Sequence, residues 1–437
     1  MRISVISDDL TGASDCGGQL VRYGLDVSVV LQKYHEKVQE NQAVIFNTDS
    51  RALAENEAYK RVKKVAKWVQ KQPFDIVYKK IDSTMRGNVG QEINAVADVF
   101  RPDFVLISPA FPKAGRQVVD GIHFLHQKEL HETEVANDPK TPVRESEIAH
   151  LIEQQAKRKV GHLFYKDLRI GSENVCKKLA QFKEQGISYI TVDAIEERDL
   201  NSLVTAVAQT DLSVVWVGST GLINYLPPLY GLQKKREQLQ LTYNENPVLF
   251  VVGSVSKVGR NQLHTLQART NTVGLEINPK NILETKEGLR KEIHRILTEA
   301  GEAFKCGKNV ALFSSAKVKE TQEMGRKYGY SAVRLSNEIS AMLGDVSRKL
   351  IEVYDLKNLF LTGGDTAQQV LERLNANSFQ LIDEVEAGIP LGKLDNQEIF
   401  AVTKAGSFGT ELAMVKSLYK LQGKKSDRLD VLNHKTV

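Results

Sequence analysis

The chain has 437 residues, enough for two or three domains with large hydrophobic cores. Its hydrophobic content of 41% and charged content of 26% are those of an ordinary globular protein. A net charge of only +5 argues against nucleic acid as the main partner and suits small anionic ligands. The three cysteines, Cys16, Cys176 and Cys306, lie far apart, which excludes a disulfide framework and a zinc ribbon and favours a reducing cytoplasm.

Neither a targeting segment nor a membrane span is expected. The first residues are predicted to form a strand, and Asp8 and Asp9 follow at once, so the apolar region of a signal peptide has no room. The longest uncharged run, 212–233, is interrupted by glycines and prolines and is typical of a strand, a turn and a short helix. We therefore expect a cytoplasmic protein without membrane contact.

The first half of the chain alternates short apolar runs with longer helical patterns. Apolar residues between 53 and 72 recur every three or four positions, the spacing of one helix face. The strands are predicted at 3–7, 27–31, 43–47, 75–78, 104–108, 189–192 and 213–217. Strand and helix in alternation indicate a parallel sheet with helical crossovers.

A second series of the same kind follows a polar stretch, and we place the domain boundary within 229–246. Its helices are predicted to include 286–304 and 338–354. Its strands are predicted at 248–252, 272–277, 310–314, 358–362 and 398–403. The predicted fold is therefore two α/β domains with mainly parallel sheets and a cleft between them, 1–235 and 236–437.

Three strand ends of the first half carry polar side chains. Asp8 and Asp9 follow the first strand, Arg51 follows the third, and the fourth leads into 79–88. The last run holds Lys79, Lys80, Asp82, Ser83 and Arg86, whose cations and hydroxyl suit a carboxylate or a phosphate. Because such ends meet at one edge of a parallel sheet, a small-molecule site is predicted there. The alternatives are helix capping by Asp9 or Thr11 and a surface charge cluster.

Histidines after the fifth strand raise the question of a metal site. His123, His126 and His131 lie close in sequence, but no second cluster completes a ligand set. We interpret them as structural histidines with satisfied hydrogen bonds. The metal ligands of the protein stay undefined at this point.

Glycine-rich turns follow three strands of the second half. They are Gly253-Ser254-Val255-Ser256, Gly363-Gly364-Asp365-Thr366 and Lys404-Ala405-Gly406. Glycine permits positive φ and close backbone approach, which we expect at Gly364 in particular, and helix N-termini offer free N–H groups to phosphate. Three such turns in one domain indicate nucleotide phosphates. Neither a Walker A motif nor a GxGxxG motif is present.

Together these motifs resemble the four-carbon acid sugar kinase family. The matching pieces are 7–13, 80–88, 109–112, 253–256, 363–366 and 404–406, in the order of the family. The resemblance implies a sugar-acid-binding N-terminal domain and a nucleotide-binding C-terminal domain. It also implies ATP-dependent phosphorylation of the terminal 4-hydroxyl of threonate, erythronate or 3-oxotetronate, with Mg²⁺ bridging the phosphates.

Phosphoryl transfer needs a carboxylate that orients the substrate hydroxyl or takes its proton, and our preferred base is Asp82, with Asp9 the second choice. The resemblance also implies contacts for single residues. The substrate contacts that we predict are Asp9, Arg51, Lys79, Lys80, Asp82, Ser83 and Arg86. The nucleotide contacts are Ser254, Ser256, Gly363, Gly364, Asp365, Thr366 and Gly406.

Other functions and assemblies remain open from the sequence. One alternative is a metal-dependent phosphatase or phosphotransferase with Asp8 or Asp9 as the nucleophile. Another is a non-catalytic protein that binds sugar acids. A homodimer is a possible assembly.

Overall fold

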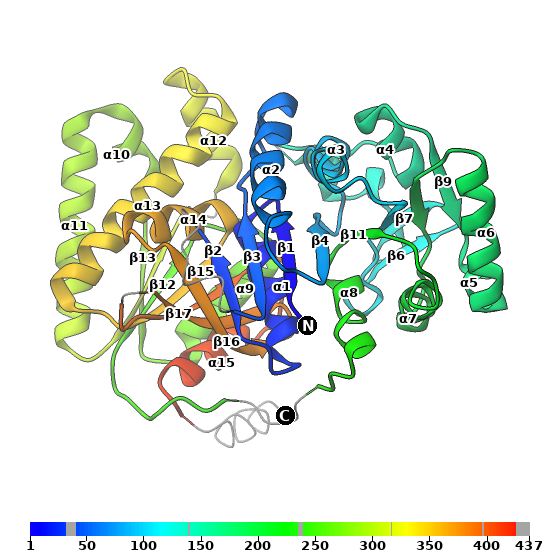
Figure 1. Ribbon diagram of the computed structural model, residues 1–437. Coiled ribbons are helices and arrows are strands. Elements are labelled where there is room, and N and C mark those ends of the chain that lie inside the picture. Colours follow the sequence, from blue (N-terminus) through cyan, green and yellow to red (C-terminus); the bar gives the residue numbers. More distant parts are fainter. Residues whose placement is uncertain (32–40, 139, 235–238, 316, 396, 425–437) are drawn as a thin grey trace, which may run out of the picture. The chain divides into compact units, whose positions relative to one another are not determined.

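The computed structural model describes the chain except residues 32–40, 139, 235–238, 316, 396 and 425–437. The chain forms two compact units (Figure 1). Unit 1 comprises Met1–Val30 and His35–Lys235, and unit 2 comprises Leu31–Tyr34 and Arg236–Val437.

Unit 1 is built on a parallel sheet whose strands lie in the order β2-β3-β1-β4-β11-β5-β10-β9. Helices follow most of these strands, as expected for crossover connections. The strands are β1 (Ile3–Ser7), β2 (Val27–Val30), β3 (Ala43–Asn47), β4 (Ile76–Lys80), β5 (Phe104–Ser108), β9 (Val160–Leu163), β10 (Tyr189–Val192) and β11 (Val214–Gly218). The helices are α1 (Leu10–Val21), α2 (Glu55–Val69), α3 (Val89–Phe100), α4 (Ile148–Ala156), α5 (Tyr165–Ile170), α6 (Ser172–Glu184), α7 (Glu197–Val207) and α8 (Thr220–Ile223).

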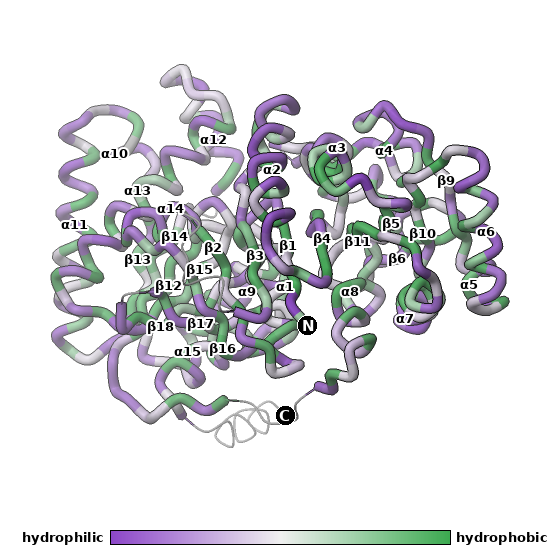
Figure 2. Tube along the Cα trace, in the orientation of Figure 1, coloured by the Kyte–Doolittle hydropathy of each residue, from purple (hydrophilic) through white to green (hydrophobic). Residues whose placement is uncertain are grey.

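The hydrophobic pattern explains these elements. Every residue of β1 and β5 is buried, as expected for central strands of a parallel sheet with helices on both faces. In α2 the buried residues Ala58, Val62, Val65 and Val69 form the stripe that the spacing predicts. Figure 2 shows the same contrast, with the hydrophobic colour along β1 and β3 and more of the hydrophilic colour on α2.

Two parts of unit 1 lie outside the sequence prediction. Strand β9 was not predicted, because only four residues with a glycine and a histidine form it. A small antiparallel sheet of β6 (Arg116–Val119), β7 (Ile122–Leu125) and β8 (Lys128–Glu129) was also missed. Its strands are too short to show the alternation that identifies a half-buried strand.

Unit 2 has a mixed sheet in the order β13-β14-β12-β15-β18-β17-β16. The first five of these strands are parallel, and β17 and β16 continue the sheet in antiparallel pairing. The strands are β12 (Val248–Val252), β13 (Thr272–Glu276), β14 (Asn309–Phe313), β15 (Asn358–Thr362), β16 (Ser378–Glu386), β17 (Ile389–Leu394) and β18 (Phe400–Lys404). The helices are α9 (Lys257–Arg269), α10 (Pro279–Glu284), α11 (Lys286–Lys305), α12 (Val318–Lys327), α13 (Ala332–Tyr354), α14 (Gly364–Arg373) and α15 (Ala413–Leu421).

The core of unit 2 lies where α9 and α15 cover the sheet. Phe250 of β12, Phe360 of β15 and Met414 of α15 are completely buried in this core. The rings of Phe250 and Phe360 lie 5.3 Å apart between centroids, which is a favourable aromatic contact. The predicted fold class, two α/β domains with mainly parallel sheets, is confirmed.

No helix in the described part of the chain combines the length and the apolar character that a membrane crossing requires.

Candidate active site

Three strand ends of unit 1 meet at one edge of its sheet. Ser7, the last residue of β1, pairs with Asn47 of β3 on one side and with Lys80 of β4 on the other. The segments that follow, 8–9, 48–51 and 81–82, therefore continue from neighbouring positions. This is the edge at which parallel sheets bind their ligands.

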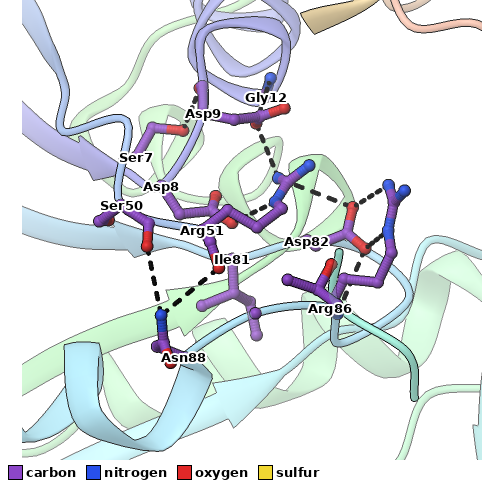
Figure 3. A network of polar contacts seen from close by, with 12 residues as sticks. Ser7, Asp8, Asp9, Gly12, Ser50, Arg51, Ile81, Asp82, Arg86 and Asn88 are labelled. Atoms are coloured by element: carbon purple, nitrogen blue, oxygen red, sulfur yellow. Dashed lines mark hydrogen bonds and ion pairs between the residues drawn. The ribbon is translucent and has the colours of Figure 1, made fainter. Parts of the chain in front are cut away.

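Arg51 lies at the centre of this edge and joins three carboxylates (Figure 3). Its Nε lies 2.6 Å from Oδ2 of Asp8, and its Nη2 lies 2.7 Å from Oδ1 of Asp9 and 3.8 Å from Oδ1 of Asp82. We call Asp8, Asp9, Arg51 and Asp82 the Arg51 cluster. Its carboxylates come from two strand ends and its guanidinium from a third, so the fold itself assembles it.

Both carboxylate oxygens of Asp82 accept hydrogen bonds from its own loop. Its Oδ2 accepts from Nε of Arg86 at 2.7 Å and from the Thr84 hydroxyl at 2.5 Å, and its Oδ1 accepts from Nη2 of Arg86 at 3.1 Å. Burial would raise the pKa of Asp82, but Arg86 and Arg51 outweigh it and hold that pKa well below its usual range. Asp82 is therefore a strongly held carboxylate and a weak base. Arg86 also contacts Asp138, at 3.2 Å.

Asp9 differs from Asp82 in both contacts and pKa. It is the N-cap of α1 and accepts from the backbone N–H of Gly12 at 2.9 Å, which confirms the capping interpretation. This bond and the Arg51 contact both fall on Oδ1. Burial, with the charge of Asp8, raises the pKa of Asp9 against the opposing effect of Arg51. Its side chain is 19% exposed, against 10% for Asp82.

Asp8 lies deeper than Asp9. Its Oδ1 is buried and has no hydrogen-bond partner among the described residues. Burial favours its neutral form, but Arg51 and Lys79 together lower the pKa of Asp8. The two neighbouring carboxylates therefore differ in pKa: the pKa of Asp8 is lowered and the pKa of Asp9 is raised.

The two adjacent lysines of β4 have different places. Lys79 is completely buried, and its Nζ lies 2.7 Å from Oε2 of Glu92 on α3. Glu92 in turn accepts from the Ser50 hydroxyl at 2.7 Å. Lys80 points its Nζ to the carbonyl oxygen of Ile81 at 2.9 Å and lies close to the N-terminus of α1, beside Gly12. Lys80 thus lies beside Asp9 and the N-terminus of α1, whereas Lys79 is paired with Glu92 and contributes to the cluster through its charge on Asp8.

Ser83 is partly exposed in the loop after β4. A further residue of unit 1 was misjudged from the sequence. His123 is completely buried, and neither ring nitrogen has a hydrogen-bond partner in the described chain, so the expectation of satisfied hydrogen bonds is wrong there. Burial lowers the pKa of His123 to about 3, although Asp82 favours the charged form. By contrast, Nδ1 of His131 lies 2.8 Å from the Ser146 hydroxyl.

The glycine turns of unit 2 lie against one another at the corresponding edge of its sheet. The Ser256 hydroxyl donates to the carbonyl oxygen of Gly406 at 2.7 Å and caps α9. A Cβ on Gly406 would lie 2.1 Å from Oγ of Ser254, and one on Gly253 would lie 1.9 Å from Oγ1 of Thr366. Side chains are therefore excluded at both glycines, and the turns after β12, β15 and β18 form one surface of backbone and small hydroxyls.

The position that needs glycine after β15 is Gly363 and not Gly364. Gly363 has φ +99°, and a Cβ there would lie 3.2 Å from the backbone nitrogen of Ser254. Gly364 begins α14 and is not among the residues with positive φ. Asp365 is exposed in the first turn of α14, and Thr366 is buried with its hydroxyl 3.3 Å from that of Ser340.

Lys404 holds the glycine turn after β18 through hydrogen bonds of its side chain. Its Nζ is nearly buried and donates to the carbonyl oxygens of Ala405, Gly406 and Phe408, at 2.8, 2.9 and 3.1 Å. Burial lowers the pKa of Lys404 to about 7. The residue thus organises the loop that carries Gly406.

No group of three or more histidine, cysteine, aspartate or glutamate side chains that could hold a metal ion occurs in the described part of the chain. A carboxylate with nucleotide phosphates remains a suitable ligand set for Mg²⁺, because that ion is commonly held by one or two carboxylates plus phosphate oxygens.

Two family models match the chain in the order of its units. A sugar-binding N-terminal domain matches residues 3–226, and a nucleotide-binding C-terminal domain matches residues 249–414. The chain is 32% identical over 429 residues to a D-threonate kinase of Salmonella typhimurium, covering 97% of this chain and 99% of that protein. It is 29% identical to a D-erythronate kinase of Heliobacterium modesticaldum, a match that covers 93% of this chain and 94% of that protein. It is 28% identical to a 3-oxo-tetronate kinase of Actinobacillus succinogenes, a match that covers 94% of this chain and 97% of that protein.

A parallel-sheet domain for sugars and a second domain for nucleotides define a kinase of small polar substrates. The chain belongs to the four-carbon acid sugar kinase family. Membership of this kinase family argues against the two alternatives left open by the sequence, a phosphatase and a non-catalytic protein that binds sugar acids.

Solved structures show the same fold. A Salmonella typhimurium LT2 protein described as a tRNA synthase superposes with a TM-score of 0.81 at 22% identity, covering 96% of this chain and 99% of that one. A Haemophilus influenzae protein superposes with a TM-score of 0.71 at 24% identity, covering 95% and 98%.

Proposed function

We propose that the protein transfers the terminal phosphoryl group of ATP to the 4-hydroxyl of a four-carbon sugar acid, with threonate, erythronate and 3-oxotetronate as the candidates. The Arg51 cluster carries this proposal. It offers a guanidinium for a carboxylate and carboxylates for hydroxyl groups, and Lys80 lies beside it as a second cation. The names of the three relatives supply the candidate acids.

In this proposal residues 1–235 bind the sugar acid and residues 236–437 bind the nucleotide. Arg51 and Lys80 hold the substrate carboxylate, and Asp82 and Ser83 hold its hydroxyls. Arg86 holds Asp82, and Lys79 is paired with Glu92 and acts on the site through packing and through its charge on Asp8. A cytoplasmic location and a homodimer stay predictions.

Asp9 is the base that we propose for the 4-hydroxyl. A base must be ionised yet able to take a proton, and the contacts of Asp82 leave it little basicity. Asp9 has a raised pKa, is more exposed, and has its two contacts on one oxygen only. Its second oxygen, Oδ2, is therefore available to a substrate hydroxyl.

The nucleotide is assigned to the three glycine turns. Phosphates would be held by hydroxyl and backbone N–H groups of Ser254, Ser256, Gly363, Gly364 and Gly406. Thr366 would contribute by packing against Gly253. Asp365, exposed beside them, would hold Mg²⁺. The ion would neutralise charge on the transferred phosphoryl group.

A coupled assay of ADP release over the stereoisomers of threonate and erythronate and over 3-oxotetronate tests the proposal. One acid should give saturable ADP release, and ³¹P NMR of the product should show a primary phosphate ester. The Asp9→Asn variant serves as the control for background ATP hydrolysis. ADP release with none of these acids, from enzyme that binds ADP, would contradict the substrate class.

A further inference from the structure

Arg260 of unit 2 has a partly buried guanidinium group without a carboxylate partner in the described chain. Arg260, in the first turns of α9, has buried Nε and Nη1 atoms that find no acceptor in the described part of the chain. Among the described residues only its Nη2 finds partners, the Ser314 hydroxyl at 3.0 Å and the Ser315 carbonyl oxygen at 3.5 Å. No carboxylate of the described chain lies within ion-pair distance. An arginine does not lose its proton in a protein, so this charge needs an anion from elsewhere.

The guanidinium lies at the edge that carries the glycine turns. Ser314, which anchors it, directly follows β14, the neighbour of β12 in the sheet. The same Ser314 hydroxyl contacts the carbonyl oxygen of Gly253, at 3.2 Å. The backbone N–H of Arg260 donates to the carbonyl oxygen of Ser256 at 3.0 Å. One serine and one helical turn therefore connect Arg260 to the Gly253–Ser256 turn.

The orientation of the guanidinium is also fixed. Its Cζ lies 5.8 Å from the ring centroid of Phe313, which covers one face, while Ser314 holds one end. The remaining N–H groups, one on Nε and two on Nη1, are the donors left for a ligand. Burial lowers the pKa of Arg260, with Glu276 opposing, as expected for a charge that lost water without gaining a close counterion.

We propose that Arg260 binds a phosphate group of the nucleotide. The inference rests on the proposed function, because it takes the glycine turns as the nucleotide site. Residues 249–414, which include Arg260 and Ser314, match the nucleotide-binding domain of the family. Phosphate is the anionic part of a nucleotide, and guanidinium groups recognise it through charge-assisted hydrogen bonds. The glycine turns supply neutral donors, and Arg260 supplies a positive charge beside them.

Titration calorimetry with ADP tests this on the full chain. Arg260→Met should bind ADP about ten- to a hundredfold more weakly than the wild type, the usual effect of one lost charge-assisted hydrogen bond. Binding of adenosine, measured in the same way, should be unchanged. Arg290→Met is the matched control, because it removes an exposed arginine of α11 in the same unit, and it should bind ADP like the wild type.

Thermal unfolding without ligand separates this role from a structural one. Removing an uncompensated buried charge should leave the Tm of Arg260→Met equal or higher, whereas a structural arginine should lower it. Arg260→Lys should recover part of the ADP affinity. Equal ADP affinity in Arg260→Met and wild type, an equal loss of adenosine binding, or a variant that no longer folds would each overturn the inference. A wild-type protein that binds no ADP would instead overturn the proposed function.

Discussion

Nη2 of Arg51 lies 2.7 Å from Oδ1 of Asp9, so the residue that we propose as the base is joined to the cation that we propose for the substrate. The pair has two consequences. Arg51 opposes the rise that burial causes in the pKa of Asp9, and the charge of Asp9 favours the charged form of Arg51. Substitution of either residue should therefore affect the other, and the two effects should not be additive.

We expect Asp9→Asn to lower kcat by about 10²- to 10⁴-fold, because an amide cannot accept the proton of the substrate hydroxyl. Asp82→Asn should mainly raise KM for the acid, since it releases Arg86 and leaves the base in place. Single-turnover rates of both variants measure the difference. A large loss of rate in Asp82→Asn with little change in Asp9→Asn would return the role of base to Asp82.

The two lysines of β4 should respond in opposite ways. Lys79→Met leaves Glu92 buried without its cation, which should cost about 3–5 kcal/mol of unfolding free energy. Lys80→Met should change stability little and raise KM for the acid. Urea unfolding followed by tryptophan fluorescence reports on unit 1 specifically, because both tryptophans of the chain, Trp68 and Trp216, lie in it.

The double variant Lys79→Met with Glu92→Met is the control for this comparison. Removing both charges should recover much of the lost stability, since no unpaired ion stays buried. A Lys79→Met protein of wild-type stability and raised KM would show that Lys79 contacts the substrate after all.

Gly363→Ala should weaken ADP binding and cost about 1–3 kcal/mol, because a φ of +99° is strained for a residue with a Cβ. Gly364→Ala is the matched control for stability alone, since this neighbour begins α14 without positive φ but belongs to the proposed nucleotide contacts. Thermal unfolding of both variants measures the stability cost, and calorimetry with ADP measures the binding of Gly363→Ala. An equal fall in Tm for the two variants would contradict the assignment of the constraint to Gly363.

His123 should make unit 1 sensitive to acid. Its pKa is about 3 in the folded chain against an ordinary value of 6.5, so the unfolded chain binds the extra proton between these values. The stability is therefore complete above pH 6.5 and falls as the pH drops towards 3. At pH 5 the loss due to this group should be about 2 kcal/mol.

His123→Leu should remove that loss, so its stability should change less between pH 7 and pH 5 than that of the wild type. Urea unfolding at the two pH values, followed by tryptophan fluorescence, gives the comparison. His150→Leu, at an exposed position on α4, should behave like the wild type. Parallel pH profiles of the wild type and His123→Leu would show that His123 does not titrate on unfolding.

The predictability of the fold followed the strength of the hydrophobic pattern. Strands β1 and β12 are continuous apolar runs that are buried throughout, and both were located to the residue. The hairpin of β16 and β17 was missed, because Asp383 falls in the apolar phase of β16 and Ile382 in its polar phase, which breaks the alternation.

The candidate site was predictable as far as it follows from strand ends. Asp8, Asp9, Arg51 and Asp82 meet because parallel strands bring their carboxyl ends to one edge. The burial of Lys79 was not predictable, because its partner Glu92 faces it only once α3 packs on the sheet. Arg260 was missed for the same reason, since only the folded chain shows that a cation inside a helix lacks a counterion.

One guanidinium shared by three carboxylates also restricts how this sequence can diverge. Arg51 meets Asp8 from Nε and both Asp9 and Asp82 from Nη2, whereas a lysine at position 51 would have a single ammonium group for all three carboxylates. Loss of Arg51 would leave three acidic side chains repelling one another at one strand edge. We therefore expect a neutral residue at position 51 to be tolerated better when one of the three aspartates is already replaced, so the order in which substitutions accumulate at this edge should depend on charge.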